Sequence, residues 1–442
     1  MISLIELQTL QPVVILLYCL QTSQSVEATG KLKINISFPF FVNTLSKKKT
    51  RALLSGSTQN STLSSINIIH QAKTEVAVTA FARMMFFLSC RLLFLLAIPL
   101  LESGTSALQC LGQNGKPVDW FIVYKVPMLR HRKWTEFGEG VAQYYLDGQT
   151  PSWTLSPQPI NATTGHAVYY TLQQLYKAKK EDTFYLMFND WQPSGKRSLN
   201  HGHAKGTLGF DKRSGFWLIH SVPRFPRAYS EGSYQWAHNG CPFGQTLFCV
   251  SFAYKNLGIL AEQLLFYYPY VYDSNLPRAI GRDFPKLGLL MNNTRMRRPP
   301  YSSVRADLVS LAGMPLTSFA KFTYFEADLY DALIAPTLKT PIVVESWLNS
   351  QFPSPNNCSS PYRVYNGDAV TLPGRGVYFK DTEDHSKYAV SFPPKNWVCI
   401  GGMNRITKEY KRGGGALCFQ NQQVWNTYWK TVTSFHACPN GV

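Results

Sequence analysis

The chain repeats one short block of sequence, and this repeat constrains its fold more than any other feature. Gly202-His203-Ala204-Lys205 and Asp384-His385-Ser386-Lys387 each place a histidine and a lysine one residue apart. Each block is followed by an apolar alternation and then by an apolar segment that begins with tryptophan, 217–219 in the first copy and 397–400 in the second. Because alternate residues of a strand point to the same face, each histidine should project together with its lysine. The repeat therefore predicts two similar halves.

The His-x-Lys spacing alone is a weak signal. Nine histidines, with lysine at about one residue in twenty, give roughly half a match by chance, whereas this chain has three matches. The third, His131-Arg132-Lys133, has no apolar alternation behind it, so we interpret it as a solvated basic run, with a phosphate contact as the alternative. Each remaining pair, taken singly, would be interpreted as polar strand residues facing water. Together they predict a site that cleaves a phosphodiester, because imidazole can attack or donate a proton and ammonium can hold a phosphate oxygen.

The first 107 residues are excluded from the predicted fold. Residues 84–107 have the apolar run and the small-residue cleavage site, Ser106-Ala107, of a secretory signal peptide. The run is too short to span a membrane comfortably. Since 83 residues precede it, we interpret 1–83 as a disordered leader from an over-extended gene model, with initiation at or next to Met84. A genuine extension with its own signal is the alternative. The mature chain is expected to begin at or near Leu108.

The composition predicts a polyanionic partner and an oxidising compartment. Lys and Arg number 44 against 26 Asp and Glu, a net charge of +18, and this favours nucleic acid or an anionic membrane. Seven cysteines follow the signal peptide, and their odd number leaves at least one unpaired. Their spacing does not indicate a metal site. Glycosylation sequons at Asn161, Asn292 and Asn357 fit a secretory route.

The mature chain divides into a first half, 108–273, and a second half, 301–442, joined by a polar linker at 274–300. The expected elements are strands at 118–126, 183–188, 244–252 and 341–345, helices at 167–178, 259–265 and 424–431, and an amphipathic segment at 319–333 whose polar side carries Glu326 and Asp328. The aromatic segment 267–272 is expected either to stack on bases or to pack in the core. Strands alternating with helices in both halves predict an α+β protein of packed α/β layers.

From Cys110 to Cys438 the chain resembles the deoxyribonuclease II family, the acid endonucleases of lysosomes. The matching segments are 117–121, 215–223, 243–247, 318–322, 382–387 and 412–415. They cover nearly the whole mature chain and lie nearer to the alpha than to the beta branch. The family is similar in fold to the phospholipase D superfamily, so the resemblance implies two pseudo-symmetric β-sheet and helix halves that share one site.

The resemblance also implies the chemistry. His203, Lys205, His385 and Lys387 are the implied catalytic residues: one histidine forms a phosphohistidine, and the other protonates the leaving 5′-oxygen and then activates water. The substrate would be double-stranded DNA and the products would carry 3′-phosphate ends. No metal or other cofactor and no stable membrane association are implied, and activity would be highest at acid pH, in the lysosome. Family convention marks His385 as the active-site residue, but the sequence does not decide which histidine attacks. Monomer and homodimer both remain open, since one chain could complete the site.

The chain departs from the wider superfamily at several positions. That superfamily has an aspartate five residues after each lysine, where this chain has Phe210 and Phe392; Asp211, one residue further, is a candidate supporting group. The departure argues against a lipid-cleaving phospholipase, which remains the second hypothesis, and an inactive secreted DNA-binding glycoprotein is the third. Arg224 stands where the family pattern has asparagine. Asn404 is expected either to support the second half of the site or to cap a turn.

The family pattern implies three disulfides and one free cysteine. The implied pairs are Cys110–Cys249, Cys358–Cys438 and Cys399–Cys418, and Cys241 is left unpaired.

Overall fold

The structure is a computed structural model that describes residues 24–26, 32–34, 107–296, 302–350, 352–374 and 376–439. The predicted signal peptide and most of the predicted leader therefore lie outside the described residues. Within the leader, β1 (Gln24–Val26) and β2 (Leu32–Ile34) pair antiparallel. Residues from Thr105 onward form one compact unit, so the two predicted halves belong to the same body.

The first half builds an antiparallel sheet. Within the described residues it has eight strands in the order β10-β6-β7-β8-β9-β3-β4-β5. In chain order these are β3 (Trp120–Lys125), β4 (Gln143–Asp147), β5 (Thr154–Leu155), β6 (Phe184–Asn189), β7 (Lys205–Phe210), β8 (Ser214–His220), β9 (Gln245–Ala253) and β10 (Val271–Asn275). Strands β3 and β6 to β8 are buried along their whole length, because both faces of the sheet are covered.

The second half builds a sheet that, among the described residues, has nine strands. Eight follow the order β11-β12-β18-β17-β16-β13-β14-β15, and β19 pairs with β14. In chain order they are β11 (Ser303–Val309), β12 (Pro315–Lys321), β13 (Ile342–Glu345), β14 (Val364–Thr371), β15 (Tyr378–Lys380), β16 (Tyr388–Ser391), β17 (Trp397–Gly401), β18 (Gly414–Gln420) and β19 (Val432–Phe435). All pairs are antiparallel except β13 with β14.

The predicted repeat appears as two matching groups of four strands. The run β6-β7-β8-β9 corresponds to β13-β16-β17-β18, and in each run a His-x-Lys block immediately precedes the second strand while the third carries a tryptophan. The histidines themselves lie just before these strands, since β7 begins at Lys205 and β16 at Tyr388. The halves differ at one flank, because β9 pairs with β3, the first strand of its hairpin, whereas β18 pairs with β12, the second strand of its hairpin.

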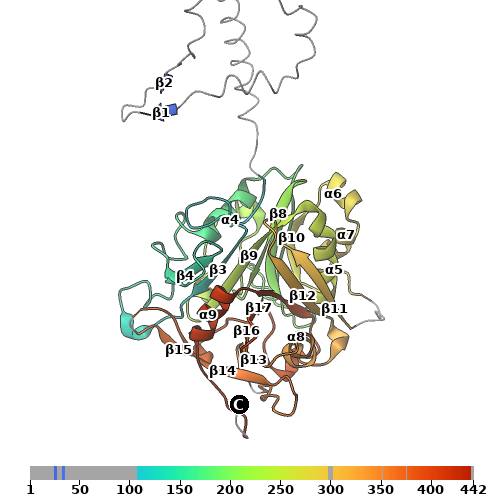
Figure 1. Cartoon of the computed structure of the whole chain (residues 1–442). Helices are drawn as coiled ribbons and strands as arrows, with labels where there is room; N and C mark the ends of the chain where they lie inside the picture. Colours follow the sequence, from blue (N-terminus) through green and yellow to red (C-terminus); the bar gives the residue numbers. More distant parts are fainter. Residues whose placement is uncertain are drawn as a thin grey trace, which may run out of the picture. The chain divides into compact units, whose positions relative to one another are not determined.

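The two sheets share one hydrophobic core. Phe419 of β18 lies against Phe248 of β9 and Trp120 of β3, with ring centroids 5.5 and 6.0 Å apart. Helices α5 (Leu257–Tyr267) and α9 (Gln422–Thr431) pack into the same cluster. On the opposite faces, α4 (Ala167–Lys177) packs on the first sheet, and a π-helical turn (Tyr330–Ile334) leading into α8 (Ala335–Leu338) packs on the second (Figure 1). The result is a layered mixed α/β unit.

The junction between the halves contains regular structure. The segment 274–300 is not simply a polar linker, because it contains α6 (Arg278–Asp283) and α7 (Lys286–Met291), and α7 buries Leu287 and Leu290 against the core. The aromatic segment 267–272, expected to stack on bases or to pack in the core, places Tyr267 at the end of α5 and Val271 at the start of β10, and both are buried in the core. Between them, Tyr268 adopts a left-handed backbone conformation that terminates the helix.

The amphipathic segment 319–333 is also different from the expectation. Its first residues belong to β12, which ends at Lys321, and Asp328 is buried rather than solvated. The Asp328 carboxylate accepts hydrogen bonds from the backbone N–H groups of Tyr330 and Asp331, both at 2.9 Å, and lies 3.6 Å from Arg405 Nε. A carboxylate at the start of a helical turn stabilises the unpaired N–H groups there, which explains why an acidic residue is buried. Single-turn 3-10 helices cover 130–132, 229–231, 238–240, 254–256, 323–325, 381–383 and 407–409.

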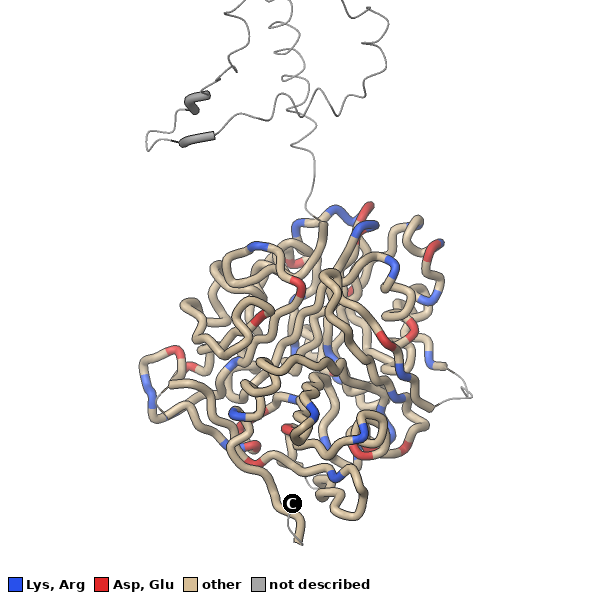
Figure 2. Tube along the Cα trace, in the orientation of Figure 1, with Lys and Arg blue, Asp and Glu red and all other residues tan. Residues whose placement is uncertain are grey.

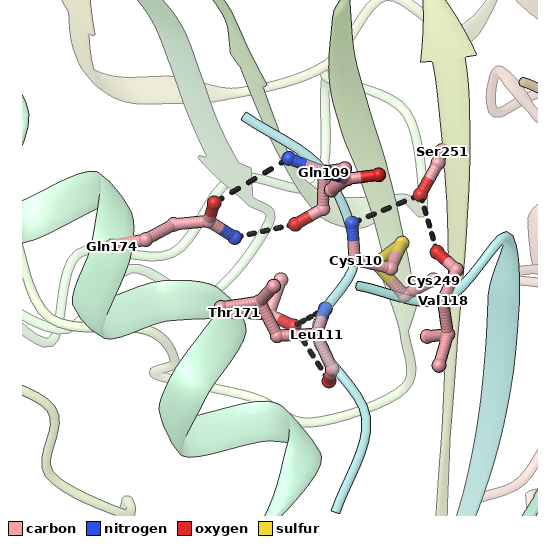
Figure 3. Close-up of a disulfide and its surroundings, with 8 residues drawn as sticks. All are labelled: Gln109, Cys110, Leu111, Val118, Thr171, Gln174, Cys249 and Ser251. Carbon is pink, nitrogen blue, oxygen red and sulfur yellow. Dashed lines mark hydrogen bonds between the residues drawn. A yellow bond between two sulfur atoms is a disulfide. The ribbon is translucent and has the colours of Figure 1, made fainter. Parts of the chain in front are cut away.

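Three disulfides are present, in the pairing that the resemblance implies. Cys110–Cys249 ties the segment before β3 to β9, Cys399–Cys418 joins directly opposed residues of β17 and β18, and Cys358–Cys438 holds the C-terminal segment. Cys241 is free and buried. Around the first bridge, the Cys110 N–H donates to Ser251 Oγ at 2.9 Å and the Leu111 N–H donates to Thr171 Oγ1 at 2.9 Å (Figure 3).

Removing the first bridge should have a large effect on stability. Cys110 and Cys249 are separated by 139 residues, and a bridge over a long loop restricts the unfolded chain strongly. We expect the double substitution Cys110→Ala/Cys249→Ala to lower the free energy of unfolding by about 2–5 kcal/mol, measured by urea denaturation. Cys241→Ala is the control, because it also removes a buried sulfur but no bridge. Equal losses in the two variants would contradict the assignment.

The sequons differ in accessibility. Asn161 and Asn292 are exposed, whereas Asn357 is half-buried and its side-chain amide donates to the Asp331 carboxylate. Among the described residues, no helix is both long enough and apolar enough to cross a lipid bilayer.

Candidate active site

Both His-x-Lys blocks lie where the two halves meet, and their lysines are buried. Lys205, the first residue of β7, donates from Nζ to Asp190 Oδ1 at 2.5 Å. Lys387 donates to the backbone carbonyl of His385. Burial is the largest cause that lowers the pKa of both histidines, and the lysine of the same half and, after it, the lysine of the other half act in the same direction. Each lysine therefore acts electrostatically on the histidine of the other half, so the structure brings the four predicted residues together.

Each histidine is also held by the backbone of the opposite half. The His203 N–H donates to the carbonyl of Gly413 at 2.9 Å, and its Nδ1 lies 2.6 Å from the carbonyl of Gly402. Reciprocally, the His385 N–H donates to the carbonyl of Gly244 at 2.9 Å. Because a carbonyl can only accept, Nδ1 of His203 carries the proton in this contact, and the lone pair is on Nε2. The two halves thus position each other's imidazole.

The close approach of the halves requires glycine at two positions. A Cβ added to Gly202 would lie 1.9 Å from the carbonyl oxygen of Tyr267, and one added to Gly413 would lie 2.3 Å from the same atom. Backbone atoms at such distances cannot be accommodated by a side-chain rearrangement. These glycines therefore allow the chain before β7 to reach the chain before β18.

A buried ion cluster surrounds His203. Asp190 receives Lys205 on one oxygen and Arg412 Nη2 on the other, at 3.1 Å, and His203 Nε2 lies 3.8 Å from it. Burial alone would raise the pKa of Asp190, but Lys205, His203 and Arg412 outweigh it and hold the pKa well below its usual range. Arg412 also donates to backbone carbonyls of residues 198, 201 and 202. Asp190 and Arg412 therefore join the two halves through one carboxylate.

Asn404 lies in this cluster and acts through Glu409. Its N–H and its side-chain amide donate to the two oxygens of Glu409, at 2.7 and 2.6 Å, and Glu409 Oε2 is 3.5 Å from His203 Nδ1. Burial raises the pKa of Glu409, opposed by Arg412 and by these hydrogen bonds. Asn404, expected either to support the second half of the site or to cap a turn, thus binds a carboxylate that lies near His203 and also interacts with Lys387.

His385 has a different environment, made of aromatic rings. Its imidazole stacks on Phe243, with centroids 4.4 Å apart and planes 3° from parallel, and meets Trp347 edge-on at 4.1 Å. Its Nε2 is buried and has no hydrogen-bond partner in the described part of the chain. Next to it, Asp384 accepts hydrogen bonds from the Tyr124 hydroxyl and, at 2.9 Å, from the Ser386 N–H. The ring is thus oriented by packing rather than by a hydrogen bond to Nε2.

The site favours neutral imidazoles when no substrate is bound. Burial lowers the pKa of His385 to about 2, with Lys387, Lys205 and Lys125 contributing in the same direction. Burial, followed by Lys205, also lowers the pKa of His203 well below its ordinary value. Burial and the charge of Lys205 lower the pKa of Lys387 to about 7. An anionic ligand would reverse these electrostatic effects, since it would favour every cationic form.

One sequence candidate does not lie with this group. Asp211 follows the far end of β7, where its carboxylate accepts hydrogen bonds from the N–H groups of Arg213, Ser214 and Leu108. A six-residue extended strand separates it from Lys205 by about 20 Å. Its local bonds are those of a turn between β7 and β8.

Other residues of the site were not singled out from the sequence. Asp190, Glu409 and Trp347 stand outside every quoted motif, and only the fold brings them to the histidines. Phe243 and Arg412 do occur in the blocks that carry the family resemblance, so membership in a block was the one available signal. The third basic run, 130–133, is solvated as predicted, with Trp134 beside it 95% exposed. Figure 2 shows that other cationic residues are spread over the compact unit with acidic residues among them.

The described residues contain no group of three or more His, Cys, Asp or Glu side chains arranged to hold a metal ion. The groups that are present can attack phosphorus, donate a proton and stabilise negative charge, through the imidazoles and ammonium groups respectively.

Paired imidazoles and ammonium groups lie where two β-sheet halves meet, and groups of these kinds can cleave a phosphate ester. The deoxyribonuclease II family profile matches residues 109–438, and the chain belongs to this family. It is similar to mouse deoxyribonuclease-2-alpha, with 39% identity over 351 residues, 78% of this chain and 98% of the relative. The rat deoxyribonuclease-2-alpha is 38% identical over the same shares. Plancitoxin-1 of Acanthaster planci is 38% identical over 76% of this chain and 94% of its own length. The protein is therefore a deoxyribonuclease that degrades DNA.

A buried histidine beside the site makes stability depend on pH. Burial and then Lys205 lower the pKa of His220 to about 3. The folded protein keeps this ring neutral, whereas the unfolded chain binds a proton below about pH 6.5, so His220 destabilises the fold as the pH falls from 6.5 toward 3. The loss between pH 7 and pH 5 is about 2 kcal/mol for one such group.

We therefore expect His220→Phe to reduce, by about 2 kcal/mol, the stability lost between pH 7 and pH 5 in urea unfolding. His131→Ala, which changes an exposed histidine, should leave that difference unaltered. An identical pH dependence in wild type and His220→Phe would show that His220 does not titrate in this way.

Proposed function

We propose that the protein is a metal-independent acid endonuclease that cleaves double-stranded DNA through a phosphohistidine intermediate and leaves 3′-phosphate ends. The observation that carries the proposal is the reciprocal arrangement of the two His-x-Lys blocks. Each histidine receives its backbone support from the opposite half, and each lysine acts on the opposite histidine. The duplicated four-strand runs support a phospholipase D-like arrangement with one site between two halves.

In the first step, Nε2 of one histidine attacks phosphorus. The Nε2–P bond forms, the bond from phosphorus to the 5′-oxygen breaks, and the second imidazole gives its proton to that oxygen. His203 has its Nε2 lone pair free of the Gly402 contact, and His385 has an unpartnered Nε2, so both are suited to these roles. Lys205 and Lys387 stabilise the additional negative charge on the phosphoryl oxygens.

In the second step, water attacks the phosphohistidine. The second imidazole, now neutral, takes a proton from water while the Nε2–P bond breaks. The phosphate remains on the 3′-oxygen, because the bond that broke first was the one to the 5′-oxygen. The first histidine returns to its neutral state and the second to its protonated state, so the site is ready for another cycle.

The electrostatics of the site explain a requirement for acid pH. Burial and the neighbouring lysines disfavour imidazolium, so few molecules at neutral pH carry the proton that the leaving oxygen needs. The negative charge of bound DNA raises the pKa values of both histidines, and lower pH completes the protonation. These properties suit an acidic compartment such as the lysosome, reached by the secretory route that the disulfides and the exposed Asn161 and Asn292 sequons support.

The test is plasmid cleavage at about pH 5 with EDTA present, followed by end analysis of the products. We expect cleavage without added metal, and fragments that a polymerase extends only after a phosphatase has removed the 3′-phosphate. A requirement for magnesium, or fragments with free 3′-hydroxyl groups, would overturn the proposed mechanism. The denatured enzyme, trapped by acid during turnover, should contain acid-labile phosphate on a histidine.

A further inference from the structure

A loop between β6 and β7 begins and ends at the proposed site. Its first residue, Asp190, binds Lys205 and Arg412, and the carbonyl of Ser198 at its end accepts a hydrogen bond from Arg412 at 3.2 Å. The Ser198 N–H donates to the carbonyl of Asp190 at 2.8 Å, and the Gln192 N–H donates to that of Lys196 at 2.8 Å. Residues 190–198 of this loop therefore form a short, hydrogen-bonded hairpin, and the base of the hairpin belongs to the site.

The hairpin carries a tryptophan between two guanidinium groups. The Arg224 guanidinium lies 4.7 Å from the ring centroid of Trp191, and that of Arg197 lies 5.4 Å from it. Arg224 has φ +56°, a left-handed conformation that is uncommon for a long side chain, and its N–H donates to the Trp191 carbonyl at 2.8 Å. Backbone strain of this kind persists where surrounding contacts hold it, and it is concentrated at functional positions.

The hairpin and the segment after β8 line an open cavity of about 730 Å³, a size typical of ligand sites. The charged side chains that line it are Lys196, Arg224, Arg227 and Glu231. Glu231 pairs with Arg227 at 2.9 Å. Lys196 and Arg224 are exposed and, within the described residues, have no carboxylate at salt-bridge distance. The cavity thus presents two cations without an internal counterion.

We propose that this cavity binds a phosphate group of the DNA strand adjacent to the scissile phosphate, and that Arg224 and Lys196 are its ligands. The inference rests on the proposed function of the His-x-Lys site. A continuous strand is favoured over a free anion because the hairpin connects the cavity directly to Asp190. Binding in the cavity is independent of base sequence, because phosphate contacts carry no sequence information.

The double substitution Lys196→Gln/Arg224→Gln tests this subsite. Duplex DNA and the small diester bis(4-nitrophenyl) phosphate are compared at about pH 5 with EDTA. We expect the ratio of kcat/KM for DNA to kcat/KM for the small diester to fall about tenfold. The slope of log KM for DNA against log salt should decrease by about 1, as for the loss of one phosphate contact. Lys116→Gln/Lys177→Gln, which removes two exposed lysines that do not line the cavity, is the matched control.

Binding measured without cleavage separates this inference from the proposed function. In a His385→Ala background, the same double substitution should weaken the binding of fluorescent duplex DNA about tenfold in anisotropy titrations. A ratio and a salt slope equal to those of the control would overturn the subsite. If millimolar inorganic phosphate binds in the cavity while the substitutions leave the affinity for DNA unchanged, the cavity is a site for a free anion. If the wild type binds DNA but does not cleave it in the absence of metal, the result instead counts against the proposed function.

Discussion

Replacing His385 with alanine is expected to reduce plasmid cleavage at about pH 5 by about 10²–10⁴-fold, the usual contribution of a positioned acid or base. The ring is held by Phe243 and Trp347 with Nε2 unpartnered, so no neighbouring group is placed to replace it. The same substitution at His203 should reduce the cleavage rate by a similar factor, because the two imidazoles act in one step. Initial rates of supercoiled-plasmid nicking, with EDTA present, provide the measurement.

His131→Ala is the matched control for both variants. His131 begins the third His-x-Lys of the chain, but it is exposed and lies outside the cluster of buried lysines. Its substitution should leave the cleavage rate within about twofold of wild type, in line with the small effects of most surface substitutions. Activity that survives His385→Ala in a folded protein would rule out a catalytic role for this histidine.

Asp190→Asn is expected to lower the free energy of unfolding by about 3–5 kcal/mol, the typical cost of leaving a buried charge without its partner. Asp190 is the shared anion of Lys205 and Arg412, which come from the two halves. Its neutralisation leaves two buried cations with weaker partners and loosens the contact between the halves. Urea denaturation at pH 7 measures the stability, and plasmid cleavage should also fall because His203 and Lys205 lose their common neighbour.

Asp211→Asn provides the comparison, since it removes one carboxylate charge from the turn after β7. Its hydrogen bonds are to the N–H groups of Arg213, Ser214 and Leu108, and its ion pair is with exposed Arg213, so we expect a loss of no more than about 1 kcal/mol. Should Asp190→Asn prove no more destabilising than Asp211→Asn, the buried ion cluster would not be what joins the halves.

Much of the fold follows from local patterns. The helices at 167–178 and 424–431 were predicted close to their observed bounds because their apolar positions recur at helical spacing and buried faces are covered by a sheet. The strands at 183–188 and 341–345 were predicted because they are short apolar runs between polar turns. The prediction for segment 319–333 is wrong because its apolar spacing fits both a strand end and a helical turn. Only the pairing of β12 with β18 decides between these two structures.

The repeat, the two histidines with their lysines, and the family follow from residue identity and spacing along the chain. Tertiary structure alone decided how the four residues are supported. Asp190, Glu409 and Arg412 come from distant positions and have no local signature, yet hydrogen bonds across the halves place them around His203. The same holds for Asn404, which donates to Glu409, and for Arg224, which folding places over Trp191. The physical reason is that burial, ion pairing and pKa depend on distance in space, which a short motif does not contain.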